Sequence, residues 1–368
     1  MAETPVVACA LRDSGAAGAE RAARFLAGEA AKRTTLLVLG DKRVLARGAA
    51  RAGVTLDLPE IALDDVGYRR PDRSWFVDLG NCDPQEIAPD GACEVAGHAA
   101  LDSLRCALAA AHIGFADAVF HLPADQAAMR LAEADYGGDA AFIERALQAD
   151  GLGTEFSIID TIWTARVTGH LPMSAVPRAI TVERVLEVLM LTRDLMGRAG
   201  VADPRIAVAG LNPHAGDDGN FGDEEIVSIE PAVTRAAQRG IRCEGPLPAD
   251  AVFLRALAGE FDAVLAMYHD QAQIPLKMMG LDRGATLIGG YPFPIVAPAS
   301  VAAANGAGEG AVPAAATRAL ELAVALARDP AEAPMRDEAL EDVVGRARAM
   351  GLAGGASVAA TAAAALAL

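Results

Sequence analysis

Three histidines in this chain share one local setting, in which each follows a strand-like segment. His214 lies in LNPHAG directly after an expected strand at Ile206–Ala209, and His269 lies in MYHDQ directly after another. His170 lies in TGHLP, in a loop after a strand-rich stretch. Loops converge beyond the carboxyl ends of parallel strands, and neutral imidazole nitrogens bind metals there. A single such histidine is more often an ordinary polar loop residue. Three of them predict one divalent metal site.

Other charged residues flank these histidines. Asp223, Glu224 and Glu225 follow His214 and are typical of the first turn of a helix, where acidic side chains are favoured. Lys277 lies eight positions after His269 and could point toward the same site, although an isolated lysine is usually solvated.

Composition limits the class of protein. The chain has 368 residues, of which 52% are hydrophobic, enough for a large core and two lobes. A net charge of −17 argues against nucleic acid and anionic membranes as partners. The five scattered cysteines predict reduced thiols. We find neither a signal peptide nor an apolar run long enough to span a membrane, so we expect a cytoplasmic protein.

Short strand patterns alternate with longer helical patterns, which indicates an α/β fold. Thr181 is a candidate helix N-cap and Gly240 a candidate helix stop. The expected strands are Val6–Leu11, Thr35–Leu39, Trp75–Leu79, Ala116–His121, Phe156–Thr161, Ile206–Ala209 and Ala263–Tyr268. The expected helices are Ala19–Ala31, Ala99–Ala111, Val182–Arg198, Glu224–Arg239, Ala314–Arg328 and Asp337–Met350.

Three segments carry a family resemblance: RIAVAGLNPHAGDDGNFGDEEI, GPLPADAVF and DAVLAMYHDQAQIPLKMMGLDRG. They closely resemble the second half of the 4-hydroxythreonine-4-phosphate dehydrogenases, and the clear resemblance spans residues 168–290. It implies a two-lobed fold related to isocitrate and isopropylmalate dehydrogenases, with a cleft between the lobes. We expect one lobe at residues 1–120 plus 297–368, on the dinucleotide side. The second lobe, at 121–296, would bind metal and substrate.

The resemblance also implies a homodimer with its active site at the interface. His170 and His214 of one subunit and His269 of the partner would hold the metal. Three imidazoles suit Zn²⁺ best, with Mg²⁺, Mn²⁺ or Co²⁺ as alternatives. The resemblance and neighbouring residues assign the remaining roles: Asp250, Asp270 and Lys277 to catalysis; Asn212, Lys277, Arg283 and Thr286 to substrate binding; Gly289, Gly290 and Asn305 to cofactor binding.

The chemistry implied is an NAD-linked oxidation of a hydroxy acid. The metal would lower the pKa of the substrate hydroxyl, and NAD would take hydride from the carbinol carbon. Where a carboxylate lies β to the new ketone, CO₂ would leave. Asp250, Asp270 or Lys277 could move the proton, and the sequence leaves the choice open.

Several family positions are changed in this chain. Asp139 and Ala140 stand where the family has a His and a Thr that help grip phosphate, and Thr286 and Ile295 replace an Asn and an Arg. Because a carboxylate repels a phosphate dianion, we expect a non-phosphorylated substrate similar to a terephthalate cis-dihydrodiol. Residues 287–290, which read LIGG, fit that branch. The alternative is the parent reaction, or one on a related four-carbon sugar-acid phosphate.

The dinucleotide loop of the family is changed as well. Residues 300–310 read SVAAANGAGEG, so the His, first Gly, Asp and Lys of the family motif are all replaced. A third hypothesis is therefore a protein that binds metal and ligand but has lost NAD. A titration with NAD would separate the hypotheses.

Overall fold

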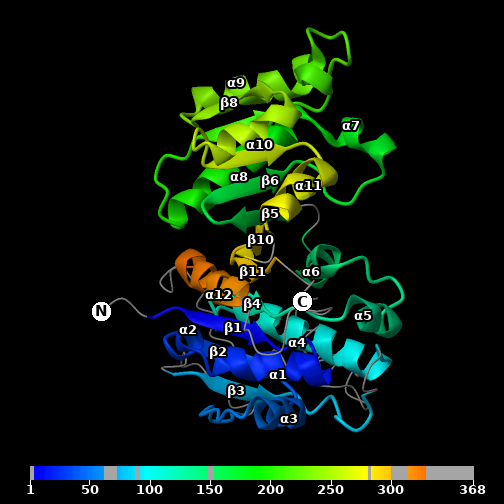
Figure 1. The fold of residues 1–368 in the computed structure, drawn as a ribbon, viewed down its shortest axis with the longest axis vertical. Coiled ribbons are helices and arrows are strands. Elements are labelled where there is room, and N and C mark those ends of the chain that lie inside the picture. Colours follow the sequence, from blue (N-terminus) through cyan, green and yellow to red (C-terminus); the bar gives the residue numbers. More distant parts are fainter. Residues whose placement is uncertain are drawn as a thin grey trace. The chain divides into compact units, whose positions relative to one another are not determined.

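The chain forms two compact units in a computed structural model that describes residues 4–61, 73–87, 92–147, 149, 153–280, 283–299 and 314–328. Unit 1 comprises Met1–Gly153 and Tyr291–Leu368, and unit 2 comprises Thr154–Gly290 (Figure 1). Unit 1 is built from two separate stretches of the chain. Residues 121–153 and 291–296, which we expected in the second lobe, belong to unit 1.

The described part of unit 1 holds a parallel five-stranded sheet in the order β3-β2-β1-β4-β11. Every residue of β1 and β4 is buried, as in parallel sheets covered on both faces. Cys9 of β1 pairs with Val38 on one side and with Phe120 on the other. The strands are β1 Val6–Ala10, β2 Thr35–Gly40, β3 Trp75–Asp78, β4 Ala118–His121 and β11 Ile295–Pro298.

Helices cover this sheet. The expected helix at residues 19–31 is two helices, because Gly28 is extended and begins the second. Gly48 of α3 packs so close to α1 that a Cβ there would lie 2.1 Å from the carbonyl oxygen of Ala19. The helices are α1 Ala16–Leu26, α2 Glu29–Lys32, α3 Lys42–Ala52, α4 Glu94–His112, α5 Gln126–Ala132, α6 Asp139–Leu147 and α12 Ala314–Leu326. The helix expected at 337–350 lies outside the described residues.

Unit 2 has a mixed sheet in the order β10-β5-β6-β9-β7-β8. All strands except β5 point the same way, because β5 is antiparallel to both β10 and β6. The carboxyl ends of β6, β9 and β7 therefore lie at one edge, where the three histidine loops begin. The strands are β5 Thr154–Ile159, β6 Ile162–Arg166, β7 Ile206–Ala209, β8 Cys243–Leu247, β9 Ala263–Ala266 and β10 Ala285–Gly289.

Some helices of unit 2 were predicted from the sequence and others were not. The bounds of α8, Val182–Arg198, are those expected, and Thr181 caps it by accepting from the Arg184 amide. Gly240 has φ 77° just after α9 and ends that helical segment. Elements that the sequence did not predict include α10 and α11. The helical elements are η2 Met173–Ala175, α7 Val176–Ala179, α8, η3 Pro213–Gly216, the π-helical η4 Glu225–Ile229, α9 Glu230–Gln238, α10 Ala249–Leu257 and α11 His269–Met279.

Two expectations from composition can be compared with the structure. All five cysteines are free in the structure. Among the described helices, none has the length and apolar character that a membrane span requires.

Candidate functional site

His170 and His269 lie side by side in unit 2. Their ring centroids are 4.8 Å apart and their planes are tilted by 41°. His170 is exposed in the loop after β6, whereas His269 is half-buried and is the first residue of α11 after β9. Since β6 and β9 are adjacent parallel strands, their carboxyl ends deliver both imidazoles to one edge of the sheet.

A carboxylate fixes the orientation of the His269 ring. The Nδ1 atom of His269 lies 2.7 Å from Oδ1 of Asp270, so Nδ1 carries the proton that it donates. The opposite nitrogen, Nε2, then has a lone pair for a ligand. A carboxylate on the far nitrogen is the usual arrangement of metal-binding histidines. Asp270, which we expected in catalysis, is exposed and contacts His269.

His214 lies in a strained turn after β7. His214 and Ala215 both have φ 55°, and Asp217 and Asp218 also have positive φ. The left-handed conformation costs roughly 1–2 kcal/mol for each such residue, so the turn must be held by contacts from outside it. The exposed His214 ring packs against Phe221 with centroids 6.0 Å apart.

One chain brings together two of the three predicted ligands. Among the residues that the structure describes, no group of three or more His, Cys, Asp or Glu side chains could hold a metal. The resemblance groups His170 with His214 and takes His269 from the partner subunit. Within one chain His269 instead lies next to His170, and the three-ligand site stays a prediction for the dimer.

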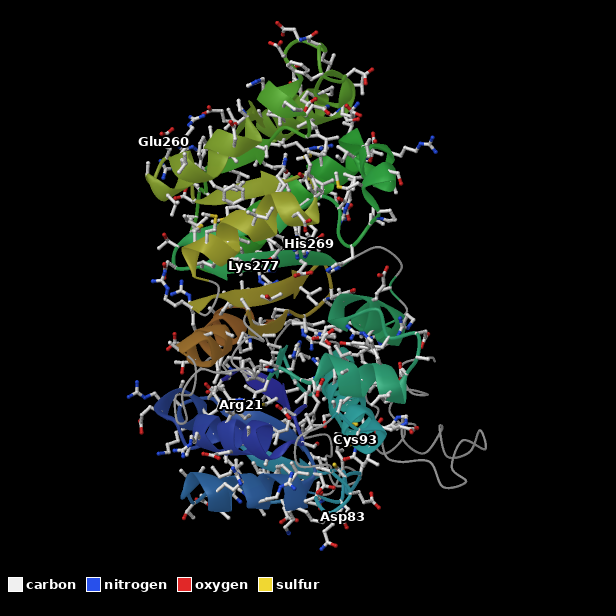
Figure 2. All side chains as sticks on the ribbon, turned by 45° about the vertical axis from the view of Figure 1, so that its right-hand side comes forward. Arg21, Asp83, Cys93, Glu260, His269 and Lys277 are labelled. Carbon is white, nitrogen blue, oxygen red and sulfur yellow. The ribbon has the colours of Figure 1, made fainter. Side chains whose placement is uncertain are left out.

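Three other residues predicted for catalysis or substrate binding lie on α10, on α11 and just before η3. Asp250 is exposed in the first turn of α10. Lys277 is exposed near the end of α11, eight residues or about 12 Å along the axis from His269. Both residues of α11 are labelled in Figure 2. Asn212 precedes the His214 turn, and its side-chain amide donates to Glu224 and Glu225.

The remaining predicted residues belong to β10 and its ends. Arg283 precedes β10 and pairs with Asp160 at 3.4 Å, and Thr286 lies near the start of the strand. The structure therefore places both toward the edge of the unit 2 sheet opposite the histidine loops. Gly289 is buried against Leu195, and a Cβ there would lie 2.5 Å from Cδ1 of that side chain, so packing also favours glycine at this position. Gly290 follows with φ 98°. Asn305 lies outside the described residues.

Glu225 has a function that we did not predict from the sequence. Its Oε1 accepts from the backbone amides of Leu211 and Asn212 at 2.7 and 2.8 Å, and its Oε2 accepts from the Asn212 side chain at 2.9 Å. The carboxylate is buried at 3% exposure. The Glu225 carboxylate therefore holds the backbone at the start of the His214 turn, and we call these contacts the Glu225 clamp. The sequence predicted only that Glu225 favours the N-terminus of a helix. Glu225 also begins a π-helix, a feature frequent near functional sites.

Asp139 in unit 1 is neutralised by a buried arginine. Arg12 donates to both carboxylate oxygens of Asp139, at 2.6 and 3.0 Å, and Tyr136 donates to Oδ1 at 2.5 Å. Burial raises the pKa of Asp139, but the Arg12 guanidinium outweighs this and holds the pKa well below its usual range. His121 lies 3.0 Å from Arg12, and burial lowers the pKa of His121 to about 4.

This ion pair removes the main electrostatic argument against a phosphorylated substrate. The Asp139 charge is balanced by Arg12, so it does not act as a free anion. Ile295, where the family has an arginine, is a core residue of β11 at 1% exposure. The expectation of phosphate repulsion at Asp139 was therefore wrong.

Sequence reasoning missed residues whose partners are distant in the chain. Arg12, Glu225 and Gln271 bind groups many positions away, and no local pattern marks such contacts. The one available signal was the position of Gln271, two residues after a candidate ligand.

The fold and the site define a class of protein: an α/β protein whose histidine loops lie at the carboxyl edge of its sheet. The sequence profile of the family described as "Pyridoxal phosphate biosynthetic protein PdxA" matches residues 32–327. The chain belongs to this family and is an oxidoreductase of the dehydrogenase class. The resemblance inferred from the sequence is confirmed.

Two curated relatives and two solved structures illustrate the similarity. The chain is 44% identical to "Putative 4-hydroxythreonine-4-phosphate dehydrogenase 2" of Rhizobium meliloti, over 88% of this chain and 94% of the relative. It is 34% identical to "Putative D-threonate 4-phosphate dehydrogenase" of Symbiobacterium thermophilum, over 78% and 86%. A 4-hydroxythreonine-4-phosphate dehydrogenase from Klebsiella pneumoniae is 28% identical with TM-score 0.71, over 89% and 99%. A terephthalate 1,2-cis-dihydrodiol dehydrogenase from Burkholderia xenovorans is 24% identical with TM-score 0.59, over 89% and 95%, which shows a shared fold alone.

Proposed function

We propose that this protein is a metal-dependent, NAD-linked dehydrogenase of a phosphorylated four-carbon hydroxy acid, such as 4-hydroxythreonine 4-phosphate or D-threonate 4-phosphate. The observation that carries the proposal is the 44% identity over nearly the whole chain to a relative named for that substrate. The Arg12–Asp139 pair supports it, because the carboxylate that argued against phosphate is neutralised. This replaces the dihydrodiol-like substrate favoured by the sequence, since the dihydrodiol dehydrogenase supports only the fold.

His170, His214 and His269 are the proposed metal ligands. Two exposed or half-exposed imidazoles with centroids 4.8 Å apart, one oriented by Asp270, suit a transition ion such as Zn²⁺. When bound, the ion would act as a Lewis acid on the substrate hydroxyl and a neighbouring oxygen. Asp270 orients His269, and Lys277 supplies a positive charge for the substrate anion. Among the described residues, none forms an ion pair with the exposed Lys277 side chain.

The proposed assembly is a homodimer in which two histidines of one subunit and a third from its partner surround each ion. Large apolar side chains are exposed on the histidine-bearing segments. Leu171 beside His170 is 44% exposed, Phe221 against His214 is 48% exposed, and Ile274 on α11 is 61% exposed. Exposed apolar residues grouped around a site mark a protein interface. A second copy is the proposed partner because most soluble oligomers are symmetric dimers.

NAD is the proposed hydride acceptor on the strength of family membership. The loop expected to bind it, residues 300–310, lies outside the described residues. Gly289, also expected to bind it, packs against Leu195. Binding of NAD is therefore the step of the proposal that needs a direct measurement.

Steady-state assays with NAD and Zn²⁺ or Co²⁺ test the proposal. The substrates are 4-hydroxythreonine 4-phosphate, D-threonate 4-phosphate, the same acids without phosphate, and a terephthalate cis-dihydrodiol. We expect NADH to form only with a phosphate ester. Turnover of the dihydrodiol alone would restore the non-phosphorylated substrate. Metal and ester binding without NAD binding would instead identify a homologue that has lost redox activity.

A lysine variant sharpens the assay. Lys277→Met should raise KM for the phosphate ester about ten- to hundredfold, because one charge-assisted hydrogen bond contributes roughly 1.5–3 kcal/mol. Lys32→Met is the matched control, since Lys32 is an exposed residue of unit 1 paired only with nearby Glu29. Equal KM values for the two variants would remove Lys277 from the substrate site.

A further inference from the structure

The side chain of Gln271 connects two of the histidine loops. Gln271 is the third residue of α11, and its Oε1 accepts from the backbone amide of Met267 at 2.6 Å. Its Nε2 donates to the carbonyl oxygen of Gly210 at 2.8 Å. Met267 lies two residues before His269, and Gly210 lies four residues before His214. One amide side chain therefore joins the end of β9 to the end of β7.

A third loop joins the same connection. The carbonyl oxygen of Met267 accepts from the Thr168 amide at 3.2 Å and from the Thr168 hydroxyl at 2.8 Å. Thr168 lies two residues before His170. Met267 is 0% exposed and Thr168 is 5% exposed, so water does not compete for these bonds. Thr168, Met267, Gln271 and Gly210 thus form one hydrogen-bonded line beneath all three histidine loops.

The two hydrogen bonds use both the oxygen and the nitrogen of the Gln271 side-chain amide. One end must accept from an N–H and the other must donate to a carbonyl, which a carboxylate cannot do. At the far end of the line, Gly210 has no space for a side chain, because a Cβ would lie 2.9 Å from Cα of Ala215. Neither α11 nor the His214 turn can therefore shift alone without breaking a partly buried hydrogen bond.

We infer that Gln271 is a positioning residue that holds the histidine loops of one subunit in fixed places, so that each loop presents its imidazole correctly to the metal sites of the proposed dimer. The inference rests on the metal site of the proposed function. Metal–nitrogen distances tolerate deviations of about 0.2 Å, and the groups behind metal ligands fix their orientation. Asp270 orients the ring of His269, whereas Gln271 positions the backbone from which His269 and His214 extend.

Metal titration of the full-length protein tests the inference. Gln271→Glu keeps the acceptor for Met267 but sets a carboxylate oxygen against the Gly210 carbonyl, and Gln271→Met removes both bonds at similar volume. We expect each to weaken Zn²⁺ binding by calorimetry about ten- to hundredfold, the usual effect of losing an outer partner of a metal ligand. The visible absorption spectrum of bound Co²⁺, which reports ligand geometry, should also change. Gln273→Met is the matched control, since Gln273 lies on the same helix and reaches only Ser157, at 3.4 Å.

Each outcome decides a different claim. Wild-type protein that binds neither Zn²⁺ nor Co²⁺ would refute the metal site itself. Wild-type affinity and spectrum in Gln271→Met, with binding intact in the wild type, would overturn the role of Gln271 alone. Should Gln271→Glu and Gln271→Met not fold, Gln271→Asn keeps an amide but is one methylene shorter, so it cannot reach both Met267 and Gly210. An unchanged Zn²⁺ affinity and Co²⁺ spectrum in Gln271→Asn would then overturn the inference.

Discussion

The imidazole rings of His170 and His269 lie with their centroids 4.8 Å apart at the carboxyl edge of the unit 2 sheet. They come from the loops after two neighbouring parallel strands, β6 and β9. The pairing of these strands brings the two loops together, and the hydrogen bonds from Thr168 to the Met267 carbonyl oxygen continue that pairing toward the histidines. His214 comes from the next strand, β7, and completes the set of candidate ligands.

Removal of a histidine should abolish tight metal binding. His170→Ala, His214→Ala and His269→Ala should each weaken Zn²⁺ binding more than roughly hundredfold, since even an outer partner contributes ten- to hundredfold. Calorimetric titration measures this. His98→Ala is the control, because His98 is a half-exposed histidine of α4 that pairs with Glu94. Retained affinity in any one of the three variants would exclude that residue from the site.

Loss of the Glu225 clamp should destabilise the protein. Glu225→Ala leaves the amides of Leu211 and Asn212 without their acceptor, and each unsatisfied group costs about 1–3 kcal/mol. We expect the free energy of unfolding in urea to fall by about 2–4 kcal/mol. Glu224→Ala is the comparison, because Glu224 accepts only from the Asn212 side chain. Similar losses for the two variants would contradict the clamp.

The Arg12–Asp139 pair should matter far more than a surface pair. Asp139→Ala leaves a fully buried guanidinium without its carboxylate, which costs about 3–5 kcal/mol. Asp203→Ala breaks the exposed pair with Arg242 and should cost less than about 1 kcal/mol. Urea unfolding at neutral pH compares them. A loss below about 1 kcal/mol for Asp139→Ala would show that its carboxylate does not neutralise Arg12.

His121 predicts a loss of stability at mildly acidic pH. Burial lowers the pKa of folded His121 to about 4, so the unfolded state binds a proton more readily between about pH 6.5 and 4. Above about pH 6.5 both states hold a neutral His121, so the free energy of unfolding keeps its full value. It falls by up to about 3 kcal/mol as the pH approaches 4. Asp139, whose pKa is also lowered, adds its own loss only at still lower pH. His121→Gln should flatten the pH dependence of urea unfolding in this window, and an unchanged slope would refute the assignment.

Charge on the exposed face of α11 should disrupt the proposed dimer. Ile274 and Met278 are 61% and 84% exposed and lie one turn apart on this helix. Ile274→Glu with Met278→Glu should give a monomer by light scattering and lose Zn²⁺ affinity at the same time. Leu131→Glu, at an exposed apolar residue of unit 1, should change neither. A double variant that stays dimeric would place the interface elsewhere.

The sequence by itself determined the family, the α/β class and the identity of the candidate ligands, because these depend on local patterns. The strand Ile206–Ala209, the helix Val182–Arg198 and its cap Thr181 were all predicted with their observed bounds. Strand β8, which reads CEGPL, was missed because glycine and proline disfavour strands and only pairing with β7 makes it one. Helix α11 was missed because it contains Pro275 and follows a buried strand directly.

Tertiary structure alone decided the charge and the partners of the functional residues. Asp139 reads as a free anion in the sequence, yet Arg12, 127 positions away, neutralises it. Glu225 reads as a helix-start acid, yet it binds backbone amides of the His214 turn. Gln271 bonds to Gly210 across 61 positions. Such contacts depend on which strands become neighbours in the sheet, and the free energy that selects those neighbours comes from burial of the whole core rather than from local sequence.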